Sequence, residues 1–366
     1  MDLAVVWFIL IAVLWIGYFC LEGFDFGVGM LLPFLGKGRD AEDTERRKRV
    51  MLGAIGPHWD GNEVWLITAG GATFAAFREW YATLFDGFYL ALLLILVALI
   101  VRNLGFEYRG KGETAGWRAN WDKIIVFGSF LPALLWGVAF ANIVGGTPLR
   151  INANELGRSV EFAGNLFTLL NPHALVGGLT TLFLFLTHGA IFIALKTDGD
   201  IRHDARALAG KLGLVAAVLA VVFLTWTNMI TGNKIAAWVF TLLAAVALVA
   251  GLVANKAGRE GYAFLGTFLA TAFAVGSLFL MLFPHVMPST LDPSATLTTL
   301  RDGSAFYAAN GDVTLQIMTV VALIFTPIVI AYQAWTYWVF RRRLSTKHIP
   351  DVAPVRERVS GSHAAN

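Results

Sequence analysis

Long runs of apolar residues, separated by short polar segments, dominate the pattern along the chain. Nine of these runs are long enough to cross a bilayer as a helix, which takes about 20 residues at a rise of 1.5 Å per residue. The alternating pattern of a membrane barrel is absent, and backbone groups in lipid must be paired within their own segment, so helices are predicted. The predicted spans are residues 3–34, 50–77, 80–102, 122–145, 166–195, 208–228, 235–254, 260–284 and 313–340.

The composition agrees with a membrane protein. Hydrophobic residues make up 57% of the 366 residues, charged residues make up 14%, and the mean hydropathy is +0.65. A soluble domain carries roughly a quarter charged residues. The sequence therefore predicts an all-α integral membrane protein and excludes soluble enzymes, disordered proteins and nucleic-acid-binding proteins.

The predicted spans belong to one domain. Residues 1–344 form this transmembrane domain, and residues 345–366, which lack an apolar run, are predicted to be a disordered cytoplasmic tail. Residues 146–165 and 285–312 are predicted as outer loops because they are rich in Thr, Ser, Asn and Pro. The first span has no basic segment before it and no small-residue cleavage site, so we expect it to stay in the mature protein.

The distribution of basic residues predicts the orientation. Of the 28 Lys and Arg, 23 fall on one side of the nine-span arrangement and five on the other. Cytoplasmic loops carry an excess of Lys and Arg, so the N-terminus is predicted outside and the C-terminus in the cytoplasm. An odd number of spans is required for this partition. The basic side consists of the loops at 37–49, 102–123, 196–211 and 256–259 and the tail after residue 340.

Two carboxylates occur in the first predicted span. Glu22 and Asp25 are three residues apart, so they share one face of a helix. Gly23 and Gly27 form a G-x-x-x-G pattern on a nearby face, which lets another backbone approach closely. An ionisable group is costly in hydrocarbon, so both acids need protein partners or water. Neighbour-capped carboxylates beside packing glycines are the alternative interpretation.

The second predicted span contains the sequence G-P-H-W-D-G-N-E-V-W-L-I at residues 56–67. Pro57 and Gly61 predict a kink with ordered water. Counted from Val50, Asp60 would lie about 15 Å into the membrane, near its middle. This density of polar groups favours a proton or ion pathway, or contact with a polar cofactor region, over simple packing. The residues concerned are His58, Trp59, Asp60, Asn62, Glu63 and Trp65.

Both polar groups fall toward the cytoplasmic half, which suits proton uptake better than proton release. Haem ligation by this chain is a further hypothesis, because His173 and His285 fall at the outer ends of two spans and could form a pair. Both follow a proline in loop-like surroundings, so interfacial or hydrogen-bonded histidines are favoured instead. Cys20 is the single cysteine, which excludes an internal disulfide.

Five segments, taken together, resemble subunit II of the cytochrome bd-type quinol oxidases. They occur in the same order and extend over most of the chain, and the second is long and specific. Nine spans with an outer N-terminus also agree with that family. The segments are G-F-D-F-G-V-G-M-L-L-P at 23–33, G-P-H-W-D-G-N-E-V-W-L-I-T-A-G-G at 56–71, G-F-E-Y-R at 105–109, N-P-H-A-L at 171–175 and F-P-H-V-M-P-S at 283–289.

The resemblance implies a respiratory terminal oxidase of the bacterial cytoplasmic membrane that oxidises quinol and reduces dioxygen to water. It implies a hetero-oligomer in which subunit I carries two b-type haems and one d-type haem, while this chain ligates no haem or metal. A small extra subunit, a structural quinone and bound lipid are compatible with the sequence.

The resemblance also implies roles for individual residues. The family's proton-delivering aspartate in P-H-W-D-G-N falls on Asp60, and His58 lies beside it. The family's acidic pair falls on Glu22 and Asp25, although the first position is often aspartate, so the longer Glu22 side chain changes the geometry. Contacts to the partner or to the haem region are expected from four neighbours of Asp60: Trp59, Asn62, Glu63 and Trp65.

Two rival interpretations remain at this point. A proton-coupled transporter or channel would use Asp60 and Glu63 as coupling sites, but transporters tend to show duplicated halves with paired broken helices. No second block equivalent to residues 56–67 occurs later in the chain. A purely structural scaffold subunit would use the same carboxylates only to stabilise an interface.

Overall fold

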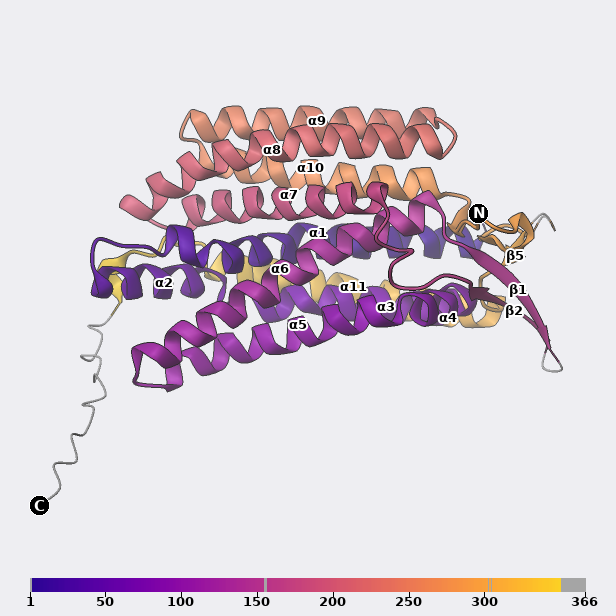
Figure 1. Cartoon of the computed structure of the whole chain (residues 1–366), viewed down its shortest axis with the longest axis horizontal. Helices are drawn as coiled ribbons and strands as arrows, with labels where there is room; N and C mark the ends of the chain where they lie inside the picture. The colour runs from indigo at the N-terminus through magenta and orange to yellow at the C-terminus, as the bar shows by residue number, and fades with distance from the viewer. Residues whose placement is uncertain (1, 155–156, 302, 304, 350–366) are drawn as a thin grey trace, which may run out of the picture.

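Eight helices in the described part of the chain are long and apolar enough to cross a membrane. The computed structural model describes residues 2–154, 157–301, 303 and 305–349. The helices lie side by side in one elongated bundle (Figure 1). They are α1 (Leu3–Leu35), α5 (Tyr89–Tyr108), α6 (Ala115–Gly145), α7 (Pro172–Lys196), α8 (Asp200–Ile230), α9 (Ile235–Lys256), α10 (Glu260–Leu282) and α11 (Asp312–Val339).

The segment predicted as one helix over residues 50–77 is broken in the structure, so that prediction is wrong at its start. Residues 50–55 belong to α2 (Ala41–Ile55), a turn occupies residues 56–58, and α3 (Trp59–Ala76) follows. Pro57 lies within the turn, where its missing N–H costs no helical hydrogen bond. The depth predicted for Asp60 is therefore also wrong, because Asp60 lies in the first turn of α3 rather than ten residues into a continuous helix.

We assign α3 as the ninth crossing. Its 18 residues span about 27 Å, close to the thickness of the hydrocarbon core. The chain starts at one end of the bundle, while the segment after α11 lies beside α2 at the other end (Figure 1). Opposite ends require an odd number of crossings. A short helix, α4 (Arg78–Gly87), continues α3 at the outer end and leads into α5.

Helix α1 lies in the middle of the bundle and packs against α3, α6, α7 and α10. Helices α7 to α10 form one edge, and α3, α5 and α11 lie on the opposite side (Figure 1). Helix α11 makes few contacts, and Leu315 is the one buried residue along it. The apolar side chains of α11 therefore face outward from this chain.

The G-x-x-x-G pattern of α1 makes its close approach within this chain. Gly27 lies against Gly189 of α7, where an added Cβ would come within 2.8 Å of the Gly189 Cα. Gly23 lies against the Phe185 ring of the same helix. Small residues at a helix crossing allow this backbone approach, and here they fix α7 against the central helix.

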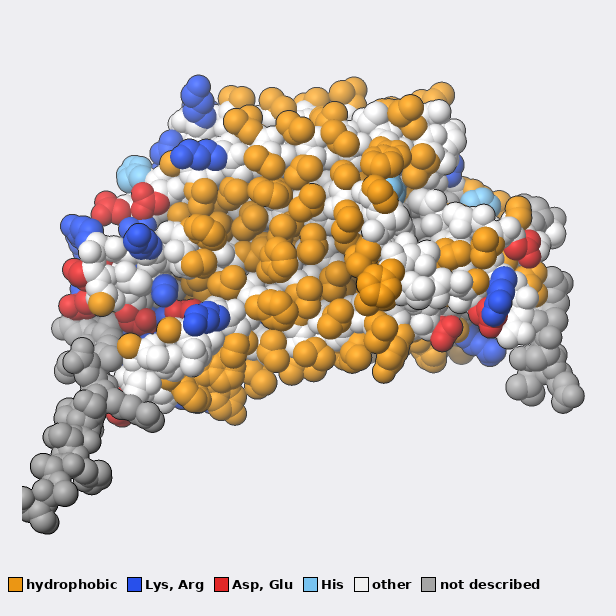
Figure 2. All heavy atoms as spheres, viewed as in Figure 1, with side chains coloured by type: hydrophobic (Ala, Val, Ile, Leu, Met, Phe, Trp, Pro, Cys, Tyr) orange, Lys and Arg blue, Asp and Glu red, His pale blue; other side chains and the backbone are white. Residues whose placement is uncertain are grey.

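The surface shows the expected layers. A broad apolar band covers the middle of the bundle, and charged side chains gather at its ends (Figure 2). The end that carries α2 holds the larger group of charges on this face. A belt of this kind matches a membrane-spanning protein whose more basic end faces the cytoplasm.

The predicted outer loops contain short strands. Strands β1 (Leu149–Asn154) and β2 (Gly157–Phe162) form an antiparallel hairpin. Arg150 at 2.5 Å and Asn152 at 3.0 Å donate to Glu161, and these hydrogen bonds hold the pKa of the Glu161 carboxyl below its usual value. A three-stranded sheet joins β3 (His285–Met287), β4 (Leu297–Thr298) and β5 (Phe306–Tyr307).

Three short 3₁₀ helices complete the described structure: Arg109–Lys111, Pro293–Ala295 and Thr346–His348. The last of these follows α11 and lies against α2. It belongs to the segment predicted as a disordered tail over residues 345–366. Residues 350–366 of that predicted tail lie outside the described residues.

The orientation can be tested with reporter fusions. A reporter that is active only in the cytoplasm, fused after Asn366, is expected to be active. A reporter that requires export is expected to be active when fused before Met1. The basis is the excess of Lys and Arg on the cytoplasmic side, which stays large when Arg102, inside α5, is left out, together with nine crossings. Activity of an exported reporter at the C-terminus would mean an even number of crossings and would reverse the proposed side of proton uptake.

Candidate functional site

A buried arginine lies at the centre of the polar residues in the bundle. The side chain of Arg102, on α5, is 0% exposed. Its Nη1 donates to the carboxylate of Glu22 and, at 3.1 Å, to Oε1 of Glu63. The guanidinium also lies 4.7 Å from the ring centroid of Phe26 and 5.0 Å from that of Phe106. Three helices, α1, α3 and α5, thus meet at one cation.

The prediction that Arg102 belongs to the basic loop at 102–123 is wrong. Helix α5 continues to Tyr108, so Arg102 lies inside the helix. The apolar residues on both sides of it, in L-I-V-R-N-L-G-F at 99–106, are the signal that could have placed it there. A charge within such a run marks a functional or interface position more often than a loop end.

An amide links Asp25 to the last helix. The Asn62 Nδ2 donates to Oδ2 of Asp25 at 2.6 Å, and the Asn62 Oδ1 accepts from the Tyr337 hydroxyl at 2.9 Å. Gln333 also donates to Asn62, at 3.2 Å, and accepts from the Trp65 indole at 2.8 Å. Both Gln333 and Tyr337 were missed by sequence analysis, although each is a polar group within the last apolar run.

His58 extends this chain of polar groups toward the cytoplasmic end. It precedes α3 and is 3% exposed. Its ring stacks on that of Tyr337, with the centroids 4.2 Å apart and the planes at 7°. Tyr337 therefore connects two residues: its ring stacks on His58, and its hydroxyl donates to Asn62.

The other predicted site residues of α3, namely Glu63, Trp59 and Asp60, lie in different surroundings. Glu63 joins the cluster around Arg102 and accepts from Asn103 at 2.7 Å. Trp59 packs near Phe106, with the ring centroids 5.3 Å apart. Asp60, however, is exposed on the surface of the chain. We call the group of residues that the structure brings together the polar cluster: Glu22, Asp25, His58, Asn62, Glu63, Arg102, Asn103, Gln333 and Tyr337.

Several atoms of the polar cluster keep free hydrogen-bonding capacity. Among the described residues, no partner is found for Glu22 Oε2, Asp25 Oδ1, the Arg102 Nε and Nη2, or His58 Nδ1. Buried polar atoms in proteins are satisfied by protein groups or by ordered water. These atoms are therefore positions where ordered water molecules can bind.

A second ionic network holds α2, at the cytoplasmic end of the bundle, in place. Arg109 donates to both carboxylate oxygens of Glu45, at 2.9 and 2.8 Å, and to Asp122 at 2.5 Å. Lys48 also contacts Asp122, at 2.9 Å. This network ties α2 to the start of α6, and it thereby positions the turn that leads into α3.

His173 and His188 have hydrogen-bond partners within this chain. His173 Nε2 lies 2.9 Å from the Thr227 hydroxyl, and His188 lies 2.7 Å from the Thr267 hydroxyl and 3.1 Å from the Cys20 carbonyl oxygen. His285 lies in β3. Within the described ranges, no three His, Cys, Asp or Glu side chains are grouped as metal ligands.

By these features the chain is a polytopic helical membrane protein with an ionisable cluster inside the membrane and with one helix, α11, largely uncovered. The family model for cytochrome bd terminal oxidase subunit II matches residues 3–340. The chain belongs to that family. It is accordingly a multi-pass protein of the bacterial cytoplasmic membrane and one subunit of a terminal quinol oxidase complex.

Named relatives agree with this assignment. The cytochrome bd ubiquinol oxidase subunit 2 of Bacillus subtilis is 39% identical over 345 residues, which cover 93% of this chain and 96% of the relative. The cytochrome bd-I ubiquinol oxidase subunit 2 of Escherichia coli is 36% identical over 377 residues, covering 94% and 96%. A chain of the bd oxidase from Geobacillus thermodenitrificans has the same fold, with a TM-score of 0.67 at 16% identity over 93% of this chain and 99% of that chain.

Proposed function

We propose that this chain conducts protons from the cytoplasm to a haem-bearing subunit I, within a complex that oxidises quinol and reduces dioxygen to water. Reduction of dioxygen to water consumes protons, so a buried haem site must be connected to water. The observation that carries the proposal is the polar cluster, which joins α1, α3, α5 and α11 inside the membrane. A bundle that served only as a scaffold would not need ionisable groups at this position.

The carboxylates of the cluster supply the proton-holding groups. Glu22, Asp25 and Glu63 lie around a single guanidinium, that of Arg102. One cation cannot neutralise three neighbouring carboxylates, so the cluster can take up and release protons without losing its ion pair. The Asn62 amide does not titrate, so it does not relay protons. It instead orients Asp25 through the 2.6 Å hydrogen bond.

The route has a direction. Protons enter near His58 and Tyr337, which lie at the cytoplasmic start of α3 and the end of α11. They pass the carboxylates of the cluster to Glu63, which contacts Arg102 and is partly exposed, and leave toward subunit I beside the exposed Asp60. Quinol oxidation on the outer side would release its own protons there, so this route separates charge across the membrane without a pump.

Subunit I is proposed to cover α3 and α11. Gly61, Gly70 and Gly71 on α3 have no atom within 4 Å of an added Cβ, so nothing in the described chain fills the space beside them. Small residues on an exposed helix face allow a second helix to approach. Asp60 lies on this side, so it would become buried at the subunit interface together with Trp59 and the exposed edge of Glu63.

The two b-type haems and the d-type haem are proposed to belong to subunit I. Nitrogens of His173 and His188 are already engaged by hydroxyl or carbonyl groups of this chain. A structural quinone has a candidate position in an apolar groove of about 630 Å³ between α1 and α11. Its walls include Val6, Leu10, Leu323, Pro327 and Ile330.

Substitution of Asp60 tests the route. Asp60→Asn keeps the size of the side chain and removes the titratable group, so quinol oxidation should fall by roughly 100-fold, a typical contribution of a positioned proton-transfer group. Asp60→Glu should retain more activity. Asp25→Asn should have a milder effect while Glu22 is present, and the double change should be worse than either single change. The measurements are oxygen consumption and the haem absorbance of the purified complex.

Asp86→Asn is the matched control, because Asp86 is an exposed aspartate of α4 and lies outside the polar cluster. It should leave both measurements unchanged. Loss of haem together with activity in Asp60→Asn would favour a structural role at the interface. Full activity with intact haems would remove Asp60 from any obligatory route.

A further inference from the structure

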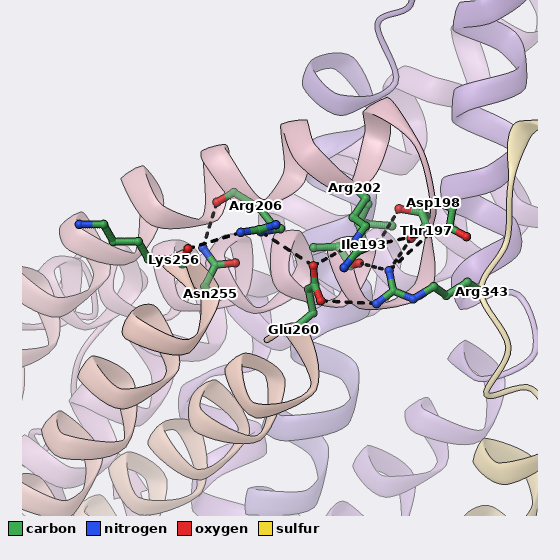
Figure 3. A network of polar contacts seen from close by, with 10 residues as sticks. Ile193, Thr197, Asp198, Arg202, Arg206, Asn255, Lys256, Glu260 and Arg343 are labelled. Carbon is green, nitrogen blue, oxygen red and sulfur yellow. Dashed lines mark hydrogen bonds and ion pairs between the residues drawn. The ribbon is translucent and has the colours of Figure 1, made fainter. Parts of the chain in front are cut away.

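We propose that the cytoplasmic end of α8 binds the headgroup of an anionic phospholipid. The site is formed by three arginines, Arg202, Arg206 and Arg343, which we call the arginine row. Two of them come from the first turns of α8, and the third follows α11 (Figure 3). The inference concerns a surface remote from the polar cluster and does not depend on the proposed proton route.

The arginine row shares one buried carboxylate. Glu260, the first residue of α10, is 4% exposed. Its oxygens lie 2.8 Å from Arg202 Nε, 3.8 Å from Arg206 Nε and 3.5 Å from Arg343 Nη2. Asp198 pairs with Arg202 and Arg343, but it is 54% exposed and lies 3.8 to 3.9 Å from them. Positive charge therefore exceeds negative charge along the row.

Arg206 has donors to spare. Its side chain is 26% exposed, so the end of the guanidinium can be reached from outside, whereas the buried Nε lies toward Glu260. Its Nη2 reaches only the Lys256 carbonyl oxygen, at 3.4 Å (Figure 3). Gly258, with φ of +74°, lies beside this guanidinium, and a Cβ there would come within 3.1 Å of Nη2. The guanidinium fork matches the oxygens of a phosphate, which makes a phosphodiester a suitable ligand.

The surface beside the row suits acyl chains. Leu214 and Val218 of α8 and Val249 and Val253 of α9 are each more than half exposed, and they continue from the row along the two helices. Helices α8 and α9 form the edge of the bundle opposite α3 and α11 (Figure 1). A partner on α3 and α11 would leave this edge to lipid.

Charge and apolar surface together indicate a lipid rather than a free ion. A free phosphate would use the arginines but not the apolar faces of α8 and α9. The cytoplasmic leaflet contains anionic lipids, and basic pockets between helices on this side are suited to their headgroups. The arginine row is therefore assigned to a phosphatidylglycerol-type headgroup with its chains along α8 and α9.

Native mass spectrometry of the intact complex can test the site. The complex is titrated with phosphatidylglycerol or, for comparison, with zwitterionic phosphatidylcholine of the same chain length. Wild type should retain phosphatidylglycerol preferentially. Affinity should fall about fivefold for R206Q and about 25-fold for R202Q/R206Q, since each basic residue near the surface contributes a factor of about five. R206K, which keeps the charge, should retain most of the affinity.

Two further variants separate lipid binding from a structural role. E260Q removes the shared carboxylate, so it should raise the affinity for phosphatidylglycerol, whereas a purely structural cluster would give no gain. R39Q is the matched control, because Arg39 is on the same cytoplasmic side, its side chain is 83% exposed, and it lies outside the row. It should leave the affinity unchanged.

Four results would overturn the assignment: unchanged affinity in R206Q, an equal loss in R39Q, no gain in E260Q, or displacement of the lipid by millimolar inorganic phosphate. The last would indicate a phosphate-ion site instead of a lipid site. If R202Q/R206Q fails to assemble, R206Q alone decides the question, because the one hydrogen bond found for the Arg206 side chain is the 3.4 Å contact with the Lys256 carbonyl.

Discussion

Arg102→Met should prevent recovery of an intact complex. The substitution keeps an apolar stem of similar length but removes the cation that contacts Glu22 and Glu63. Breaking a buried ion pair from one side leaves uncompensated charge and costs about 3–5 kcal/mol. That loss is comparable to much of the stability of a typical domain. The measurement is the yield and thermal stability of the purified complex, with haem absorbance as the readout of assembly.

Two controls make this prediction specific. Arg39→Met removes an exposed arginine of the cytoplasmic side and should change stability by less than about 0.5 kcal/mol. The double variant with Arg102→Met and Glu22→Gln should lose less than the sum of the two single changes, because both remove the same ion pair. A normal yield of stable, haem-containing complex with Arg102→Met alone would contradict the role given to this cation.

Gly27→Leu is the second change expected to have a large effect. Gly27 packs on Gly189 of α7, and even a Cβ would meet the Phe185 carbonyl oxygen and the Gly189 backbone. A leucine must separate α1 from α7, and α1 carries Glu22 and Asp25. We therefore expect loss of the assembled complex. Gly27→Ala should give a smaller destabilisation of about 1–3 kcal/mol through overpacking.

Gly116→Ala is the matched control for this pair of changes. Gly116 is also a helical glycine, but nothing lies within 4 Å of its added Cβ. Alanine favours a helix over glycine by up to about 1 kcal/mol, so this change should be neutral or slightly stabilising. Thermal unfolding of the wild-type, Gly27→Ala and Gly116→Ala complexes distinguishes close packing from a general effect of helix propensity. Equal melting temperatures for Gly27→Ala and Gly116→Ala would show that α1 and α7 can separate without cost.

The local features of this protein could be predicted from the sequence. Hydropathy along the chain predicted α1, α9, α10 and α11 to within two residues, because the cost of exposing backbone and polar groups to lipid is a local property of each segment. The predicted starts of α6, α7 and α8 differ from the observed ones by six to eight residues, and the span predicted at 80–102 is wrong, because the structure divides it between α4 and α5. The counts of Lys and Arg predicted the orientation for a similar reason. The placement of Glu22 and Asp25 on one helix face also followed from their spacing.

Only the tertiary structure showed which polar groups meet. Arg102 is 80 residues from Glu22 in the sequence, and Tyr337 is 275 residues from Asn62. Such contacts depend on how each helix is rotated about its own axis. Helices that are apolar on all sides give little indication of that rotation, because lipid and a neighbouring helix accept the same side chains.

The break at residues 56–58 shows the same division between local and tertiary information. Sequence predicted a kink from Pro57, but apolar residues lie on both sides of the polar stretch at 56–63, so the last turn of α2 and the helix α3 were joined into one predicted span. The structure separates the two helices at the turn that contains Pro57, and Arg109 contacts α2 through Glu45, 64 residues away in the chain. Sequence therefore determined which segments enter the membrane and in which direction. The packing of the helices decided that Glu22, Asp25 and Glu63 share one arginine while Asp60 faces outward, since that depends on the rotation of each helix.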